Sequence, residues 1–125
     1  MSKASKKILI VEDELAMKNI LADKFEKEGF VVFLAKNGIE GLEIVKKEQP
    51  DLILLDIVMP RMDGVTMLKN LRKQKKTGSI PVIILTNLSE PGDVSNGLNG
   101  GVKDFLVKTD WSLDEVVKKA QERLK

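Results

Sequence analysis

Short apolar runs alternate along the chain with longer stretches in which apolar residues recur every three or four positions. The short runs have the length and the continuous apolar character of strands buried on both faces of a sheet. In the central run, four apolar residues pass directly into a carboxylate, Asp56. We predict strands over residues 7–11, 31–34, 52–56, 80–85 and 104–107.

The first of the longer stretches, residues 15–28, has the period of a helix. Met17, Leu21 and Phe25 recur at four-residue spacing, and Gly29 is a typical stop at the carboxyl end. A second helix should open at residues 37–38 and end before Pro50. Its inward face is expected to carry Ile39, Leu42 and Val45.

Three further helices are expected in the second half of the chain. Asp63 is a plausible N-cap for a helix that carries Val65, Leu68 and Leu71. Residues 89–99 form the weakest helix, because glycine and asparagine lower its propensity. The last helix opens on a capping box of Ser112 and Glu115 and on a hydrophobic staple of Trp111 and Val116. Its inward positions are Leu113, Val116, Val117, Ala120 and Leu124.

Strict alternation of strands and helices indicates an α/β fold in which helices cover both faces of a parallel sheet. A chain of 125 residues suits one domain with a single core, and we expect one domain over 1–125 with a flexible lead-in at 1–6. No apolar run approaches the roughly 18 residues of a membrane span. We therefore expect a cytoplasmic protein without membrane contact.

The amino-acid composition excludes several kinds of chemistry. The chain has no cysteine, which excludes disulfides and thiol catalysis, and no histidine, which excludes histidine acid–base chemistry and a phosphohistidine on this chain. A net charge of +2 is too small to indicate a nucleic-acid surface, so no direct DNA binding is expected.

Polar residues stand at the carboxyl ends of four predicted strands: Glu12 with Asp13, Asp56, Thr86 and Lys108. In an open parallel sheet these ends meet at one edge, where ligands bind. Clustered carboxylates repel one another, and a hard cation such as Mg²⁺ relieves that repulsion. A carboxylate can also act as a nucleophile toward phosphorus, and the transfer then needs charge neutralisation by metal and by a cation.

These residues and their neighbours resemble the response-regulator receiver domain, the CheY-like phosphoacceptor of two-component signalling. The resemblance covers essentially the whole chain, and each of its markers alone is modest. The markers are residues 11–13, residues 55–60 with Asp63 and Gly64, residues 85–86, and residues 104–108. It implies a doubly wound, flavodoxin-like (βα)₅ fold with strand order 2-1-3-4-5.

The resemblance also implies roles for single residues. Asp56 is similar to the phosphorylated aspartate, and Lys108 to the lysine that pairs with the phosphoryl group. Mg²⁺ would be held by Glu12, Asp13, Asp56 and the backbone carbonyl of Val58. Thr86 and Phe105 are similar to the hydroxyl and aromatic switch residues.

Each assignment has a plainer alternative. Glu12 and Asp13 are also suitable charges for a helix start, and Thr86 for the end of a strand. Lys108 could be a surface lysine, and Phe105 could serve only the core.

Three features depart from the family pattern or bear on its chemistry. Thr109 replaces a proline that often follows the lysine in a cis peptide bond, and a cis bond before a non-proline residue costs about 3 kcal/mol. Asn87 stands where the family usually has a small residue, and its bulk is expected to narrow access to Asp56. Val58 and Leu88 are apolar and cannot orient a hydrolytic water, so slow self-dephosphorylation is expected.

The implied function is a phosphorylation-operated switch and not a metabolic enzyme. The expected phosphodonor is a sensor histidine kinase or a phosphotransfer protein, with contacts on the first helix at Leu15 or Ile20. No output domain is expected in this chain, so either an unknown downstream protein reads the switch or the chain is a fragment of a longer protein. The expected state is a monomer or a phosphorylation-linked dimer. The alternative is a constitutive binding module with the same fold. A haloacid-type phosphatase is disfavoured because Val58 stands where a second aspartate would be needed.

Overall fold

The computed structural model describes residues 6–56, 67, 69–71, 73, 80–86, 104–107 and 112–124. Side chains are described for these residues except 56, 85, 86 and 104–107. The elements are β1 (Lys7–Val11), α1 (Leu15–Lys27), β2 (Val31–Ala35), α2 (Gly38–Glu48), β3 (Leu52–Asp56), β4 (Val82–Thr86), β5 (Asp104–Val107) and α5 (Leu113–Arg123).

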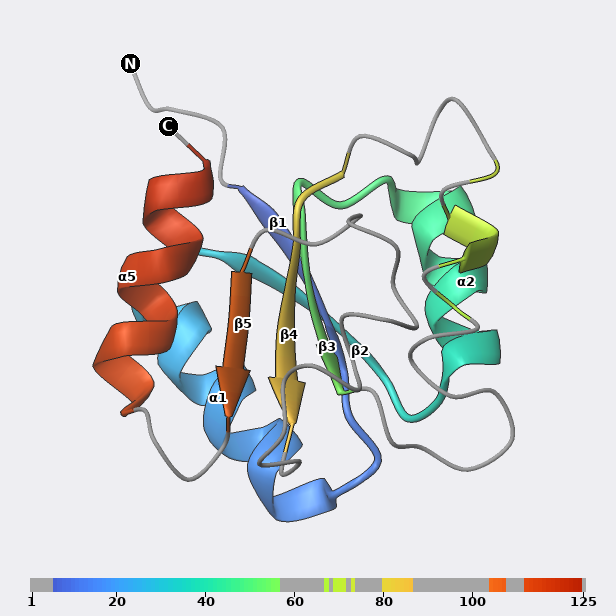
Figure 1. The fold of residues 1–125 in the computed structure, drawn as a ribbon. Helices are drawn as coiled ribbons and strands as arrows, with labels where there is room; N and C mark the ends of the chain where they lie inside the picture. The colour runs from blue at the N-terminus through green and yellow to red at the C-terminus, as the bar shows by residue number, and fades with distance from the viewer. Residues whose placement is uncertain are drawn as a thin grey trace.

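The five strands form one parallel sheet in the order β2-β1-β3-β4-β5 (Figure 1). This order confirms the prediction of a doubly wound fold. β1 and β3 begin and end as predicted, whereas β2 extends one residue further and β4 covers 82–86 instead of 80–85. The carboxyl ends of all strands lie at the lower edge of the sheet in Figure 1.

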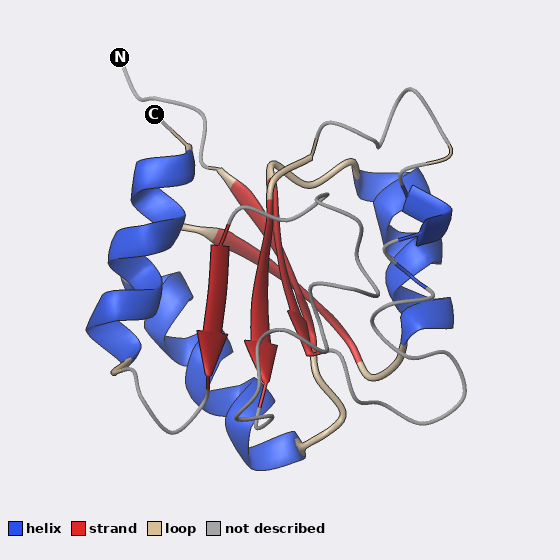
Figure 2. Cartoon of the chain, in the orientation of Figure 1, coloured by secondary structure: helices blue, strands red, loops and turns tan. Residues whose placement is uncertain are grey.

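Helices cover both faces of the sheet (Figure 2). Because side chains alternate along a strand, Ile8 and Ile10 face α1 and α5, whereas Leu9 and Val11 face α2. The core between the sheet and α1 and α5 also holds Leu21, Phe25 and Val116. The core on the α2 side holds Val45, Met67 and Leu71. The continuous apolar runs of the sequence are therefore explained by burial on both sides.

α1 begins at Leu15 as predicted and ends at Lys27, one residue before the predicted end at Glu28, which is the C-cap. Leu21 and Phe25 are fully buried and Met17 is partly buried. The chain leaves the helix through Gly29, whose φ of +94° is a conformation that residues with a side chain rarely adopt. Phe30 then packs edge-to-face on Phe25 with ring centroids 5.0 Å apart, which fixes the path into β2.

α2 opens as predicted but faces the core with different residues. The Oδ1 of Asn37 accepts a hydrogen bond from Glu40 N at 2.9 Å and caps the helix. Val45 is buried and Leu42 is partly buried, as expected, but Ile39 is 37% exposed, so its predicted inward position is wrong. The buried residues of the first turns are the glycines Gly38 and Gly41.

The end of the Met67 side chain, from the next helical segment, lies close to Gly41. A Cβ at this position would lie 2.7 Å from Met67 Cε and 3.2 Å from Val11 Cγ2. We expect Gly41→Val to lower the free energy of unfolding by about 2–3 kcal/mol. The added side chain would overpack the site, because Met67 and Val11 beside it are both fully buried. Urea unfolding measures the change. Glu43→Val, an exposed position of the same helix, controls for propensity and should cost less than about 0.7 kcal/mol; equal losses in both variants would contradict the packing argument.

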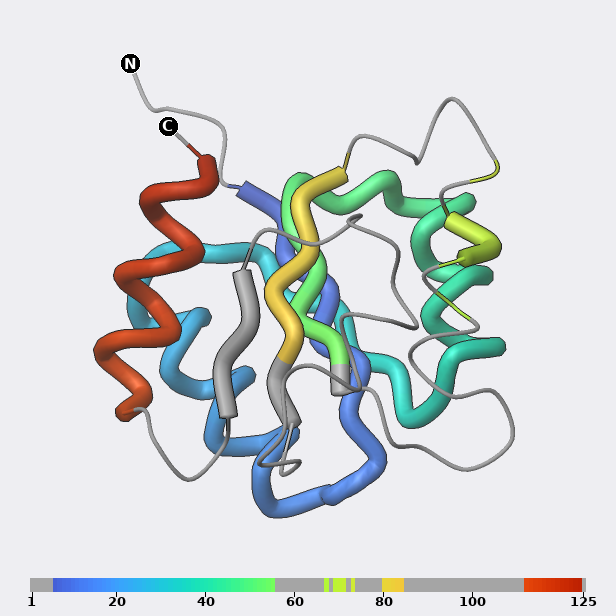
Figure 3. The backbone as a smooth tube through the Cα atoms, in the orientation of Figure 1, coloured from blue at the N-terminus to red at the C-terminus, as the bar shows by residue number. Residues whose placement is uncertain are grey.

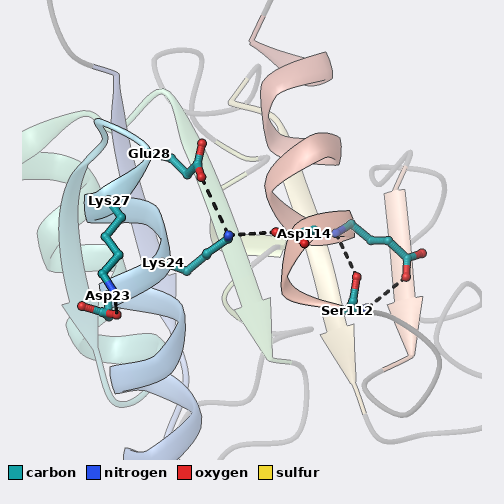
Figure 4. Close-up of polar contacts among 7 residues, drawn as sticks. Asp23, Lys24, Lys27, Glu28, Ser112 and Asp114 are labelled. Carbon is teal, nitrogen blue, oxygen red and sulfur yellow. Dashed lines mark hydrogen bonds and ion pairs between the residues drawn. The ribbon is translucent and has the colours of Figure 1, made fainter.

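α5 begins on the predicted capping box and is tied to α1 by an ion pair (Figure 4). Ser112 Oγ accepts from Glu115 N at 3.3 Å, and Glu115 Oε1 accepts from Ser112 N at 3.0 Å. Lys24 Nζ lies 2.8 Å from Asp114 Oδ1, and this hydrogen bond is the main reason that the pKa of Lys24 is raised. Val116, Val117 and Ala120 are buried and Leu113 and Leu124 partly buried, as the sequence pattern predicts.

Several sequence predictions lie outside the described residues. They include the cap at Asp63, the helix at 89–99 and the staple contact of Trp111. Of the predicted helix after Asp63, residues 67 and 69–71 are described as helical, and Leu71 is buried as expected. Each helix formed by the described residues is too short or too polar to span a bilayer.

Candidate functional site

The acidic pair after β1 lies at the carboxyl edge of the sheet, and its two members differ. Glu12 continues the strand ladder, since its N–H donates to Ala35 O at 3.0 Å. Its side chain is 1% exposed, and its Oε2 accepts from Glu14 N at 3.2 Å. Asp13 is exposed. The pair therefore offers one carboxylate inside the protein and one on its surface.

The alternation of β1 explains this difference. Ile10 belongs to the core under α1 and α5, and Glu12, two positions on, is on the same side of the strand. Its carboxylate is thus directed to the start of α1, where Glu14 is an N-cap without a capping side chain of its own. The sequence predicted Glu12 and Asp13 only as an acidic pair, although the two-residue period of the strand places them on opposite sides.

Strand register brings the other candidate positions to the same edge. Val11 is paired with Leu55, so Glu12 and Asp56 each follow a paired residue on neighbouring strands. Asp56 is itself paired with Leu85 of β4, directly before Thr86. Asp56 is therefore flanked by the strand end that carries the acidic pair and by the strand end that carries Thr86.

The fourth strand end extends the same row. Thr86 is paired with Val107, the last residue of β5, and Lys108 is the next residue in the sequence. Lys108, Val58, Asn87, Leu88 and Thr109 lie outside the described residues, as do the side chains of Asp56, Thr86 and Phe105. Their side-chain roles therefore stay predictions. No described peptide bond is cis, and the bond between Lys108 and Thr109 is not among them.

The described part of this edge suits a hard cation. Glu12 and Asp13 provide carboxylate oxygens, the ligand type that Mg²⁺ prefers, and the exposed Asp13 leaves room for the waters that the ion retains. Asp56 ends the adjacent strand in register. A buried carboxylate beside other acids is costly without a cation or hydrogen bonds. The residues present at this edge therefore fit a magnesium ion.

Comparison with known proteins identifies the family of the chain. The model of the response regulator receiver domain matches residues 8–121. RpaA of Synechocystis, a DNA-binding dual master transcriptional regulator, is 37% identical over 102 residues, which are 82% of this chain and 42% of RpaA. PhoP of Bacillus subtilis, the alkaline phosphatase synthesis transcriptional regulatory protein, is 38% identical over 83% of this chain and 42% of its own length.

Solved structures agree with the sequence comparison. The receiver domain of the Francisella response regulator 1452 superposes with a TM-score of 0.86 at 32% identity, covering 96% of this chain and 97% of that domain. The chemotaxis response regulator CheY4 of Vibrio cholerae gives a TM-score of 0.88 at 27% identity, covering 97% of this chain and all of CheY4.

The chain thus belongs to the response-regulator receiver domain family. Members of this family are regulatory domains and not metabolic enzymes, and they generally bind Mg²⁺ for phosphorylation. The chain spans less than half the length of the curated relatives RpaA and PhoP.

One expectation is corrected by these relatives. The small net charge led us to expect no direct DNA binding, but the family members that match include a DNA-binding regulator and other transcriptional regulators. The matched segment is less than half of each of those proteins. The net charge of a receiver segment is therefore no measure of nucleic-acid binding in such regulators, and the expectation was wrong.

Proposed function

We propose that this domain is a phosphoacceptor switch in which Asp56 receives a phosphoryl group from a phosphohistidine of a kinase or phosphotransfer partner. An Asp56 carboxylate oxygen forms the new bond to phosphorus, and the bond from phosphorus to the imidazole nitrogen of the donor breaks with its electron pair going to that nitrogen. The observation that carries the proposal is the register of the sheet, in which Asp56 ends the strand between those that lead to Glu12 and to Thr86.

We assign the magnesium site to Glu12, Asp13, Asp56 and the backbone carbonyl of Val58. When bound, Mg²⁺ would neutralise charge on the phosphoryl oxygens. Burial of Glu12 and exposure of Asp13 support this assignment, because one carboxylate is fixed by the protein and the other is open to the ion and its waters. The hydrogen bond from Glu14 N restricts the Glu12 carboxylate further.

The remaining roles follow from chemistry at the same strand ends. Lys108 would pair with the phosphoryl oxygens, and the Thr86 hydroxyl would donate a hydrogen bond to one of them. Phe105 lies on β5, next to the strand that ends at Thr86, and is paired with Ile84. Its movement with Thr86 would change the face that a downstream partner contacts.

Phosphorylation itself is the first test. The domain is incubated with a small acyl phosphate and Mg²⁺, and its intact mass is measured beside a sample in which a chelator removes the metal. We expect addition of one phosphoryl group only when Mg²⁺ is present. Absence of any addition, with a known receiver domain phosphorylated in parallel, would reject the switch and favour the constitutive binding module.

A further inference from the structure

Exposed lysines gather at the opposite edge of the molecule, on the side of α2. Lys46 and Lys47 lie in the last turn of α2, and Lys69 and Lys73 lie in and just after the next helical segment. All four are exposed. We call them the amino-edge lysines, because both helical segments end near the edge of the sheet at which β3 and β4 begin (Figure 3).

Packing holds the two segments together. Met67 reaches the backbone of α2 at Gly41, and Val45 and Leu71 belong to one buried core. Ile53, near the start of β3, is paired with Val82, the first residue of β4, so the chain enters both strands at the same edge. The amino-edge lysines are thus carried by neighbouring elements of a rigid core and face solvent from them.

Their charge is less neutralised than that of lysines elsewhere. On the other helices Lys24, Lys27 and Lys119 form ion pairs with acidic neighbours. Among the described residues no ion pair involves an amino-edge lysine. The sequence adds to this asymmetry, because residues 64–89 contain five basic residues and no acidic one.

Among the described residues, this surface exposes no large hydrophobic side chain. The large hydrophobic residues that the described structure exposes belong to α1, β2 and the first turn of α2. None of them lies in the last turn of α2 or in the described residues of 67–73. Protein interfaces take most of their energy from buried apolar or aromatic anchors, and single-stranded nucleic acids need aromatic platforms for stacking. A lysine surface without either feature suits an extended row of phosphates.

We infer that the amino-edge lysines bind the phosphate backbone of duplex nucleic acid without reading its sequence. The net charge of +2 hides the basic character of residues 64–89, which contain no acidic residue, whereas Glu43 and Glu48 flank Lys46 and Lys47 on α2. The inference is independent of the chemistry proposed for Asp56, since it concerns the other edge of the sheet.

The test is fluorescence anisotropy with a labelled, mixed-sequence DNA duplex of about 20 base pairs, titrated between about 50 and 200 mM salt. At the lowest salt we expect a Kd of roughly 10⁻⁴ to 10⁻⁵ M that weakens steeply as salt rises. Changing all four amino-edge lysines to Gln should weaken binding more than about tenfold and reduce the salt slope by roughly three to four.

The matched control changes four lysines on the other face of the sheet, which removes the same total charge. Its substitutions are Lys18→Gln, Lys27→Gln, Lys118→Gln and Lys119→Gln. Less than about a twofold loss is expected in this control. If both sets of substitutions weaken duplex binding equally, the effect depends only on net charge and the inference is overturned. Binding of a poly-glutamate chain without binding of the duplex would also overturn it, in favour of an acidic protein partner.

Discussion

Asp56→Asn should abolish phosphoryl addition while the domain stays folded. An amide oxygen has almost the shape of the carboxylate oxygen that it replaces but is a far weaker nucleophile, so no acyl phosphate can form at this position. The substitution ends β3 with a side chain of similar volume, and the paired residues Leu54 and Leu55 keep the strand in place. Intact-mass measurement with Mg²⁺ and a small acyl phosphate should show one added phosphoryl group in the parent and none in the variant.

Asp51→Asn provides the matched control, because Asp51 directly precedes the same strand at its other end. Its Oδ2 accepts a hydrogen bond from Lys7 N at 2.8 Å, which an asparagine oxygen can also accept. This variant should be phosphorylated like the parent. Addition in the Asp56→Asn variant would move the site to another carboxylate and refute the assignment of Asp56.

The sequence predicted the sheet well because burial on both faces leaves a signal that needs no tertiary information. The apolar runs ending at Val11 and at Asp56 coincide with β1 and β3, and the helix that follows Ser112 begins on the predicted cap. The positions of the polar residues at strand ends then follow from parallel topology alone. The strand register adds only that Glu12 and Asp56 follow the paired residues Val11 and Leu55 on neighbouring strands.

Details that depend on a neighbouring helix were beyond the sequence pattern. The period of α2 favoured Ile39 as a core residue, but Met67 packs against Gly41, and Ile39 is partly exposed. A glycine has no apolar side chain and therefore gives no signal in a hydrophobic pattern. The local environment of Glu12 was missed for a related reason, since the backbone N–H of Glu14 that bonds to its carboxylate gives no signal in a side-chain pattern.

Partner chemistry was misjudged because net charge averages over a surface. A value of +2 gives no information on position: Glu12 and Asp13 lie at one edge, whereas Lys46 and Lys47 lie at the other, with Glu43 and Glu48 beside them on α2. The transcriptional regulators among the relatives are matched over less than half of their length, so the net charge of this segment does not decide whether such a whole regulator binds DNA. Charge has to be read element by element before a class of partner is excluded.

Removing the charge of the acidic pair should produce the second large effect. We expect Glu12→Gln/Asp13→Asn to raise the Mg²⁺ concentration that gives half-maximal phosphorylation by roughly 100-fold or more, about 2.7 kcal/mol, because two charges that attract the cation are lost. Gln at position 12 can still accept the hydrogen bond from Glu14 N, so the start of α1 should be preserved. A rate series over Mg²⁺ concentration measures the shift.

Glu14→Gln is the control for this pair, because Glu14 is an adjacent but exposed acid. It should shift the half-maximal Mg²⁺ concentration less than about threefold, as expected for a screened surface charge. Fluorescence of Trp111, three residues from Lys108 and the only tryptophan, can follow Mg²⁺ binding without a phosphodonor. An unchanged Mg²⁺ requirement in the double variant would remove Glu12 and Asp13 from the metal site, even if Asp56 were still phosphorylated. The roles of the acidic pair and of the phosphoacceptor are therefore tested separately.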